Sequence, residues 1–163
     1  MDPVDRTPTE PADYAALSAL YGALLTGTAV SARARQAIGN EELPALAAAS
    51  FALSKLVVHE KVESWMRRPF VDEGRREPKG RRLRYAVGEL LTCTRCTGAW
   101  SALGLVALRI HAPTAGRTVT TVLAASAAND LLHAVFSYLC AHARAEENLA
   151  AGTAPGSHVH RAA

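Results

Sequence analysis

Four stretches of the chain are mainly apolar, and each is long enough to form a helix. In the first, residues 14–32, no side chain is charged, and small residues recur every four positions, at Ala15, Ala19, Ala23 and Gly27. This spacing places them on one face of a helix, where a second helix can pack closely in a bilayer or in a soluble bundle. The charge-free length favours a membrane span, because about 20 apolar residues cross the hydrocarbon core.

The other three stretches predict helices over residues 43–68, 85–110 and 118–145. Asn40 precedes the second helix and is a favourable N-cap, while Pro69 ends it because proline cannot continue a helix. At about 1.5 Å per residue, each of the three is long enough to cross a bilayer. We therefore predict an all-α protein with about four helices.

The composition agrees with helices that pack closely. Hydrophobic residues make up 49% of the 163 positions and aromatic residues only 6%, so alanine and leucine dominate the apolar surface. Such a composition favours helices over a β-sandwich. The mean hydropathy of +0.04 is high for a soluble protein and low for a membrane protein. We expect a small transmembrane helical bundle, and we retain a soluble or peripheral helical bundle as the alternative.

The two ends of the chain differ from the apolar middle. Residues 1–12 are acidic and contain three prolines, and residues 146–163 are rich in alanine and glycine. Both segments are typical of disordered arms. The expected layout is a single helical membrane domain over residues 13–145, with a disordered acidic arm before it and a disordered tail after it.

Residues 67–84 form a basic loop, in which eight of 18 residues are Lys or Arg and three are acidic. If all four helices cross a membrane, 12 Lys and Arg lie on the side of this loop and the two termini, against four on the other side. Cytoplasmic loops of membrane proteins carry such an excess of positive charge. We therefore expect a multi-pass protein whose termini and basic loop lie in the cytoplasm.

The basic loop also indicates which partners to expect. Juxtamembrane Lys and Arg each contribute about 1 kcal/mol to the attraction of anionic lipid head groups, so we expect the loop to face such lipids. A nucleic-acid site would need stacking aromatic residues or a known module, and only Phe70 and Tyr85 lie in or beside the loop. Nucleic acid is therefore not an expected partner.

Residues with reactive side chains concentrate in ELLTCTRCTGAW, residues 89–100. On a continuous helix, four of them would share one face: Glu89, Cys93, Cys96 and Trp100. The third cysteine, Cys140, lies far away in the sequence, so a secreted scaffold held by disulfides is not expected.

Further polar residues lie inside the expected helices, namely Lys55, His59, Arg95, Asn129, Asp130 and His133. Ionisable groups are costly in a bilayer, so they usually face the interior of a bundle and pair with one another. We expect a polar site shared by the second, third and fourth helices. Glu89 and His133 are the best candidates to assist Cys93 and Cys96 in it.

The cysteine pair has three interpretations. In the structural one, which we prefer, cysteine packs as a small apolar residue, and the protein is not an enzyme and needs no cofactor. A zinc or other metal site needs four ligands and the pair supplies two, so His133, Cys140, His59 or Glu89 would have to complete it. A redox pair would be stabilised at a helix N-terminus or by a cation such as Arg95, but the motif is predicted to lie inside a helix.

Two runs, SKLVVHEKVESWMRRPF and RRLRYAVGELLTCTRCTGAW, followed by an apolar segment, resemble a bacterial family of small multi-pass membrane proteins, domain of unknown function 1360. The most specific parts are Arg-x-Pro-Phe at Arg67–Phe70 and Cys-x-x-Cys-x-Gly-x-Trp at Cys93–Trp100. The chain departs from the family at two places. Many members have proline after the first cysteine, where this chain has Thr94. The segment before the Arg-Pro stretch often carries an acid where this chain has His59 and Glu60. One member, from endospore-forming bacteria, is described as a sporulation protein, and the resemblance implies no catalytic residues.

The resemblance and the pattern together predict a small integral protein of the bacterial cytoplasmic membrane with a structural or accessory role. We expect it to pack against a partner helix or a second copy of itself. The alternative is a membrane-embedded thiol, redox or metal-binding protein that uses the Cys93-x-x-Cys96 motif.

Overall fold

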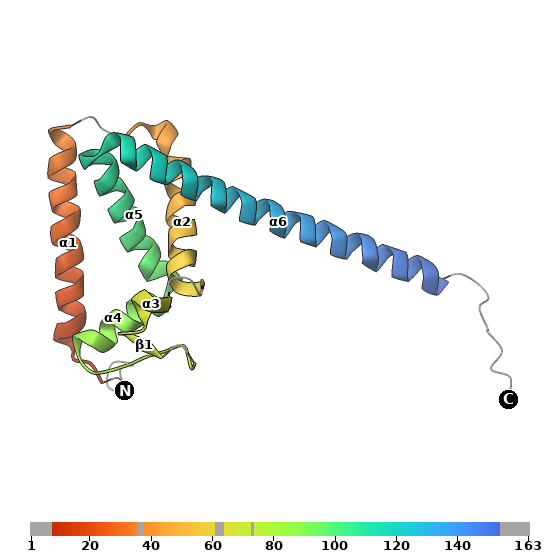
Figure 1. Cartoon of the computed structure of the whole chain (residues 1–163), viewed down its shortest axis with the longest axis horizontal. Helices are drawn as coiled ribbons and strands as arrows, with labels where there is room; N and C mark the ends of the chain where they lie inside the picture. Colours follow the sequence, from red (N-terminus) through yellow and green to blue (C-terminus); the bar gives the residue numbers. More distant parts are fainter. Residues whose placement is uncertain (1–7, 36–37, 61–63, 73, 154–163) are drawn as a thin grey trace. The chain divides into compact units, whose positions relative to one another are not determined.

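The structure, a computed structural model, describes residues 8–35, 38–60, 64–72 and 74–153 (Figure 1). Within these ranges it contains six α-helices, one 3-10 helix and two short strands, so the predicted all-α class is confirmed. The chain divides into two units, Met1–Ala127 and Ala128–Ala163, and each is described by itself.

Three helices of the first unit run beside one another: α1 (Pro11–Arg33), α2 (Leu43–His59) and α5 (Thr94–His111). Leu46, Ala49 and Leu105 form the buried core between α2 and α5. Small residues face each other where these two helices meet: a Cβ on Gly98 of α5 would lie 3.8 Å from Oγ of Ser54 of α2, at ordinary contact distance. The α2–α5 pair is therefore the packed centre of this unit.

The face of α1 that contacts other helices is not the one that its small residues indicate. Ala15, Ala19, Ala23 and Gly27 are all exposed. The hydroxyl of Tyr14 instead donates a hydrogen bond to Glu89, and the ring of Tyr21 meets that of Trp100 edge to face, with centroids 5.2 Å apart. Aromatic side chains thus bridge α1 to its neighbours, and the alanine face points elsewhere.

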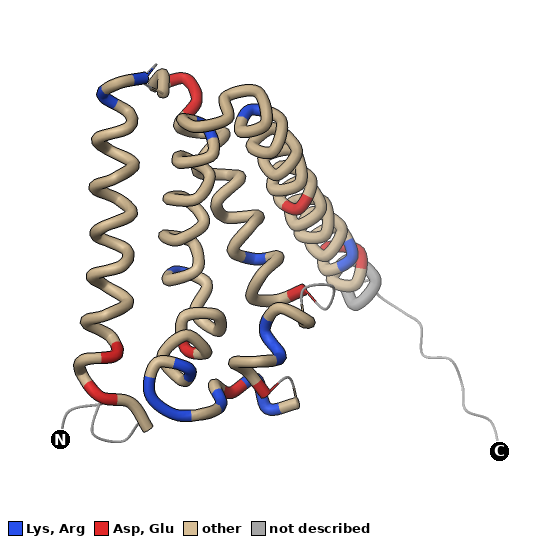
Figure 2. The backbone as a smooth tube through the Cα atoms, turned by 60° about the vertical axis from the view of Figure 1, so that its left-hand side comes forward, with Lys and Arg blue, Asp and Glu red and all other residues tan. Residues whose placement is uncertain are grey.

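Charged residues of α1, α2 and α5 lie mostly at the helix ends, with Lys55 as the exception (Figure 2). At one end, Arg82 pairs with Glu10, and its Nε lies 3.5 Å from Oδ2 of Asp13. At the opposite end, Arg109 donates two hydrogen bonds of 2.7 Å each to the carboxylate of Glu42. The arrangement leaves an apolar middle between two ionic ends.

The predicted helix over residues 43–68 is shorter in the structure: α2 ends at His59, and a separate helix, α3 (Ser64–Arg67), follows. Two arginines of the basic loop, Arg67 and Arg76, donate hydrogen bonds to backbone carbonyl oxygens at the end of α2, those of Val57, Val58 and Glu60. The last carbonyl groups of a helix lack intrahelical partners and attract positive charge. These arginines therefore cap α2.

The basic loop contains a short antiparallel hairpin of β1 (Val71–Asp72) and β2 (Glu77–Pro78). The hairpin lies against α4 (Leu83–Thr92) at Gly88. A Cβ at this position would lie 2.5 Å from the carbonyl oxygen of Phe70 and 2.9 Å from Cβ of Pro78. The close contact between loop and helix therefore requires glycine.

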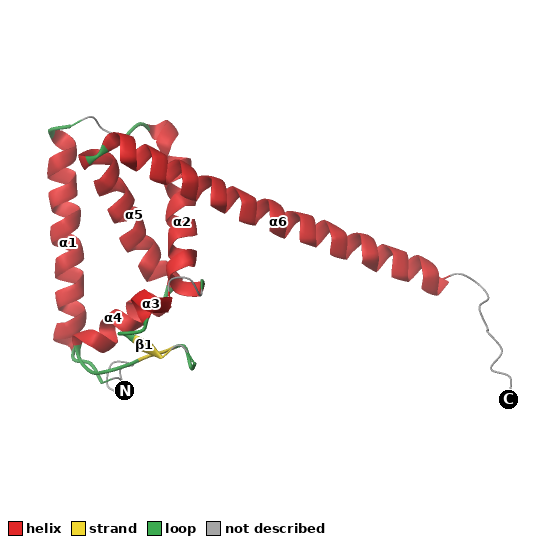
Figure 3. Cartoon of the chain, in the orientation of Figure 1, coloured by secondary structure: helices red, strands yellow, loops and turns green. Residues whose placement is uncertain are grey.

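The prediction of one continuous helix over residues 85–110 is wrong. Two helices, α4 and α5, cover this stretch, and Cys93 between them has an extended backbone with φ −100° and ψ 107° (Figure 3). The break divides the apolar run into a ten-residue and an 18-residue helix. It is the main difference between the predicted and the observed helices.

The last helix, α6 (Pro113–Thr153), extends beyond the predicted range of 118–145 at both ends. Proline suits the first turn of a helix, where its missing N–H is not needed. Gly116 makes the turn from α5 tight, because a Cβ there would lie 2.5 Å from Cα of Arg109. In the second unit, α6 exposes large apolar side chains, including Leu131, Leu132, Val135, Phe136 and Tyr138.

The expected disordered ends are partly helical. Pro11 and Ala12 begin α1, and the backbone N–H of Glu10 donates a hydrogen bond of 2.9 Å to the side chain of Asp13, as at many helix starts. Residues 146–153 continue α6. Residues 1–7 and 154–163, for which disorder is also expected, lie outside the described residues.

Three helical segments are long and apolar enough to cross a membrane: Pro11–Arg33, Asn40–His59 and Pro113–Leu149. Within the described ranges α5 is not among them: it has 18 residues, of which Arg95 and Arg109 are charged, and it is less apolar than the three. Large apolar side chains of α1 are exposed, including Leu20, Leu24 and Val30. Both features are those of a membrane protein. By length and composition, three segments could cross a membrane, whereas the sequence predicted four.

The contact between the hairpin and α4 predicts opposite outcomes for two glycine substitutions. Gly88→Ala places a methyl group against the backbone of Phe70, so it should destabilise the protein by about 1–3 kcal/mol. Gly98→Ala, the matched control in α5, meets Ser54 at an ordinary 3.8 Å and should leave stability unchanged or raise it. Thermal unfolding in detergent, followed by circular dichroism, measures both. Unfolding of Gly88→Ala at the wild-type temperature would contradict this packing.

Candidate functional site

Cys93 occupies the N-cap position of α5. Its backbone N–H donates to the carbonyl oxygen of Leu90 at 3.3 Å, which closes α4, and its own carbonyl oxygen accepts from the N–H of Thr97 at 2.9 Å, which opens α5. Its sulfur accepts a hydrogen bond of 3.3 Å from the backbone N–H of Cys96. The sulfur therefore accepts the hydrogen bond that the side-chain oxygen of a Ser, Thr, Asp or Asn N-cap usually accepts.

Two threonines beside the break accommodate it. The hydroxyl of Thr92 donates to the carbonyl oxygen of Glu89 at 3.0 Å, and that of Thr97 donates to the carbonyl oxygen of Leu90 at 2.8 Å. The carbonyl groups at the end of α4 thus find partners although the helix stops. Short polar side chains that bond to nearby backbone groups favour helix ends over helix interiors. The sequence Thr-Cys-Thr at 92–94 is consistent with such an end.

The two thiols of the pair have different acidities. A hydrogen bond from the Cys96 thiol, followed by the backbone N–H of Cys96, lowers the pKa of Cys93 below the ordinary value of a thiol. The same hydrogen bond, in which Cys96 is the donor, raises the pKa of Cys96 to about 11. A thiol that loses its proton more readily, beside a neighbour one turn away that holds its proton, is an arrangement suited to thiol–disulfide exchange.

A cavity of about 550 Å³ lies beside the pair, between α1, α4 and the start of α5. Three aromatic residues line it, Tyr14, Tyr21 and Trp100, together with aliphatic side chains. Its polar lining includes Glu89, Cys93 and Cys96. Glu89, Cys93, Cys96 and Trp100, which the sequence places on one helix face, therefore face one cavity even though the helix is broken.

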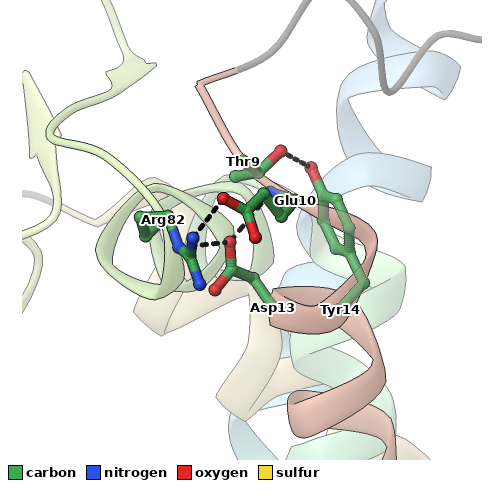
Figure 4. Close-up of polar contacts among 5 residues, drawn as sticks. All are labelled: Thr9, Glu10, Asp13, Tyr14 and Arg82. Atoms are coloured by element: carbon green, nitrogen blue, oxygen red, sulfur yellow. Dashed lines mark hydrogen bonds and ion pairs between the residues drawn. The ribbon is translucent and has the colours of Figure 1, made fainter.

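The contribution of α1 to the cavity was not predicted from the sequence. Tyr14 connects the cavity to the ionic end of the bundle. Its hydroxyl accepts a hydrogen bond of 3.0 Å from Thr9 (Figure 4) and donates one to Glu89. In the same figure, Arg82 contacts Glu10, one turn before Tyr14, and Asp13, directly before it. The spacing of Tyr14 and Tyr21, seven residues apart on one face of a helix, was the available signal.

The other predicted site residues of the first unit do not line this cavity. His59 lines a separate cavity of about 240 Å³, where Arg76 donates to its Nδ1 at 3.3 Å and its Nε2 lies 3.2 Å from the hydroxyl of Thr94. Lys55 is half-buried on α2, and Arg95 is exposed. Four more belong to α6 in the second unit: Asn129, Asp130, His133 and Cys140. In the first unit, α1, α4 and α5 line the cavity beside the thiols, and the contribution of the fourth helix to a shared polar site stays a prediction.

The structure lends no support to a zinc or other metal site. Among the described residues, no three His, Cys, Asp or Glu side chains lie close enough together to hold a metal ion. A closed zinc site needs four such ligands. Within the described part of the chain, Cys93 and Cys96 thus supply two of the ligands that such a site requires.

A model of the family described as "Protein of unknown function (DUF1360)" matches residues 45–136, more than half of the chain. The chain belongs to this family. The DUF1360 match includes the basic loop, the break at Cys93 and the cysteine pair, whereas α1, which supplies Tyr14 and Tyr21, precedes it. Comparisons with curated proteins and with solved structures found no match.

The unequal acidities predict unequal labelling of the two thiols. With iodoacetamide, Cys93 should react at a lower pH than Cys96, because a lowered pKa keeps the thiolate present at lower pH. Cys96→Ala removes the hydrogen bond and should move the labelling midpoint of Cys93 to higher pH. Peptide mapping by mass spectrometry follows each cysteine separately. Identical pH profiles for the two thiols would show that the assigned roles are wrong.

Proposed function

We propose that this DUF1360 protein is an integral membrane protein that carries out thiol–disulfide exchange at the cytoplasmic face, with Cys93 as the nucleophile and Cys96 as the resolving thiol. The observation that carries the proposal is the position of Cys93 at the N-terminus of α5, where the N–H of Cys96 donates to its sulfur. Helix N-termini stabilise thiolates, because their free N–H groups and dipole favour negative charge.

The apolar middle of the first unit supports a position within the membrane. α1 and α2 are apolar enough to cross it, and α5 lies beside both. We propose that α5 enters the membrane with them, with Arg95 and Arg109 near its two ends, and that α6 makes a further crossing. Arg109, at the far end of α5, would enter the interface already paired with Glu42, which reduces the cost of its charge.

The ionic ends of the bundle support an orientation. Arg82 of the basic loop contacts Glu10 and Asp13 at the start of α1, so the N-terminal arm and the loop lie on the same side. The excess of Lys and Arg on this side favours the cytoplasm. We therefore place the protein in the bacterial cytoplasmic membrane, as the resemblance of its sequence implies, with both termini and the cysteine pair on the cytoplasmic side.

Within the loop, the basic residues divide into two groups. Arg67, Arg76 and Arg82 bond to α2 and to the start of α1. Arg68, Arg75 and Arg81 are exposed. We propose that the exposed group faces anionic lipid head groups, since basic residues next to a membrane are attracted to them.

The exchange proceeds in two balanced steps. The thiolate of Cys93 attacks one sulfur of a substrate disulfide, the substrate S–S bond breaks, and the departing sulfur takes a proton. Cys96 then loses its proton and attacks the sulfur of Cys93, which forms the Cys93–Cys96 disulfide and releases the second substrate thiol. Two electrons and two protons pass from the protein to the substrate. Among the described residues that line the cavity, Glu89 is the one carboxylate, and it can take the proton of Cys96.

The proposal predicts that the pair cycles between dithiol and disulfide. In mixtures of reduced and oxidised glutathione, the purified protein should form the Cys93–Cys96 disulfide with a midpoint between about −270 and −120 mV, the range of exchange proteins. Cys96→Ser should trap a mixed disulfide on Cys93, and Cys93→Ser should trap none. Mass spectrometry after acid quenching measures each species. A pair that stays reduced at every potential, or equal trapping by both variants, would refute the exchange function.

A further inference from the structure

The cavity beside the cysteine pair has the size and lining of a small-molecule site. Its volume of about 550 Å³ falls within the range of about 300–1,000 Å³ that is usual for such sites. Tyr21 and Trp100 meet edge to face at 5.2 Å, with an angle of 68° between their planes, and Leu17 and Leu90 add aliphatic surface. Walls of this kind favour a flat, apolar ring.

The polar groups are concentrated near the cysteine end of the cavity. Tyr14 and its acceptor Glu89 lie there, whereas Tyr21 stands seven residues further along α1, about 10 Å along the helix axis, with the hydroxyl of Ser18 between them. A ligand of this cavity would therefore extend from an apolar interior to two thiols, a phenol and a carboxylate. A polar disulfide peptide does not match the apolar part.

We infer that the cavity binds a lipid-soluble quinone, and that this quinone accepts the electrons of the Cys93–Cys96 dithiol. The inference rests on the proposed exchange function and adds a second partner to it. Thiol–disulfide exchange is reversible, so a substrate dithiol reduces the Cys93–Cys96 disulfide, and the quinone then oxidises the pair again. A quinone is a flat ring that dissolves in the bilayer, where α1 and α2 would place the cavity. It also takes up two electrons and two protons, which is what a dithiol gives when it becomes a disulfide.

The reaction balances without any further reagent. The Cys93 thiolate forms a C–S bond to a ring carbon, and the displaced electron pair moves to a carbonyl oxygen, which takes a proton. The Cys96 thiolate attacks the sulfur of Cys93, the C–S bond breaks, and its electron pair returns to the ring. A second proton then completes the hydroquinone. The two thiols lose two electrons and two protons, the quinone gains both, and Glu89 with Tyr14 can relay the protons.

The test uses the full chain, purified in detergent and fully reduced, with a decyl-tailed benzoquinone whose ring is fully substituted. One equivalent of hydroquinone, followed by ultraviolet absorbance, should appear for each Cys93–Cys96 disulfide, and the rate should saturate with quinone. Ala99→Phe places a ring in the cavity from an exposed position of α5 and should slow quinone reduction at least tenfold. Ala23→Phe, at an exposed position of α1 outside the cavity lining, is the matched control and should not slow it.

Oxidation by glutathione disulfide separates this inference from the proposed function. If glutathione disulfide oxidises the pair but the quinone does not, the quinone inference is wrong and the exchange function stands. The same conclusion follows if Ala99→Phe and Ala23→Phe reduce the quinone equally well, or if the quinone arylates cysteines without forming a disulfide. If neither reagent oxidises the pair, both proposals fail. Loss of quinone reduction in Ala99→Phe, with glutathione oxidation retained, supports the site.

Discussion

Two helix ends meet at one residue, Cys93, and the backbone groups that both ends leave without partners must be satisfied there. Thr92 and Thr97 donate to carbonyl groups of α4, and the sulfur of Cys93 accepts an N–H of α5. This break allows α4 to run along the basic loop while α5 enters the bundle. It also puts a thiol at a helix N-terminus, beside the cavity. The fold and the proposed chemistry depend on the same few hydrogen bonds.

Arginine residues hold the parts of the first unit that surround this break. Arg67 and Arg76 cap the end of α2, Arg82 joins the loop to the start of α1, and Arg109 pairs with Glu42 at the opposite end. Each guanidinium group has several donors in a fixed plane and suits carbonyl and carboxylate partners. The basic residues thus leave the middle of the bundle apolar, and the exposed ones remain available to lipid head groups.

The sequence was sufficient for the helical class, the family and the start of α1 within a few residues, because these depend on local composition and on motifs. It could not show that Tyr14 and Tyr21, rather than the alanines of α1, face the neighbouring helices, since both patterns have helical spacing. The break at Cys93 left a signal in Thr92 and Thr94. The capping of α2 by Arg67 and Arg76 needed knowledge of the tertiary fold.

The central claim is that a reactive Cys93 lies at the cytoplasmic face of an integral membrane protein. Its most direct test is labelling with a membrane-impermeant maleimide in inside-out and right-side-out vesicles, followed by a wash with alkaline carbonate. The account predicts labelling of Cys93 in inside-out vesicles only, in protein that stays with the washed membranes. Labelling of Cys93 in right-side-out vesicles, or release of the protein into the carbonate supernatant, would contradict it.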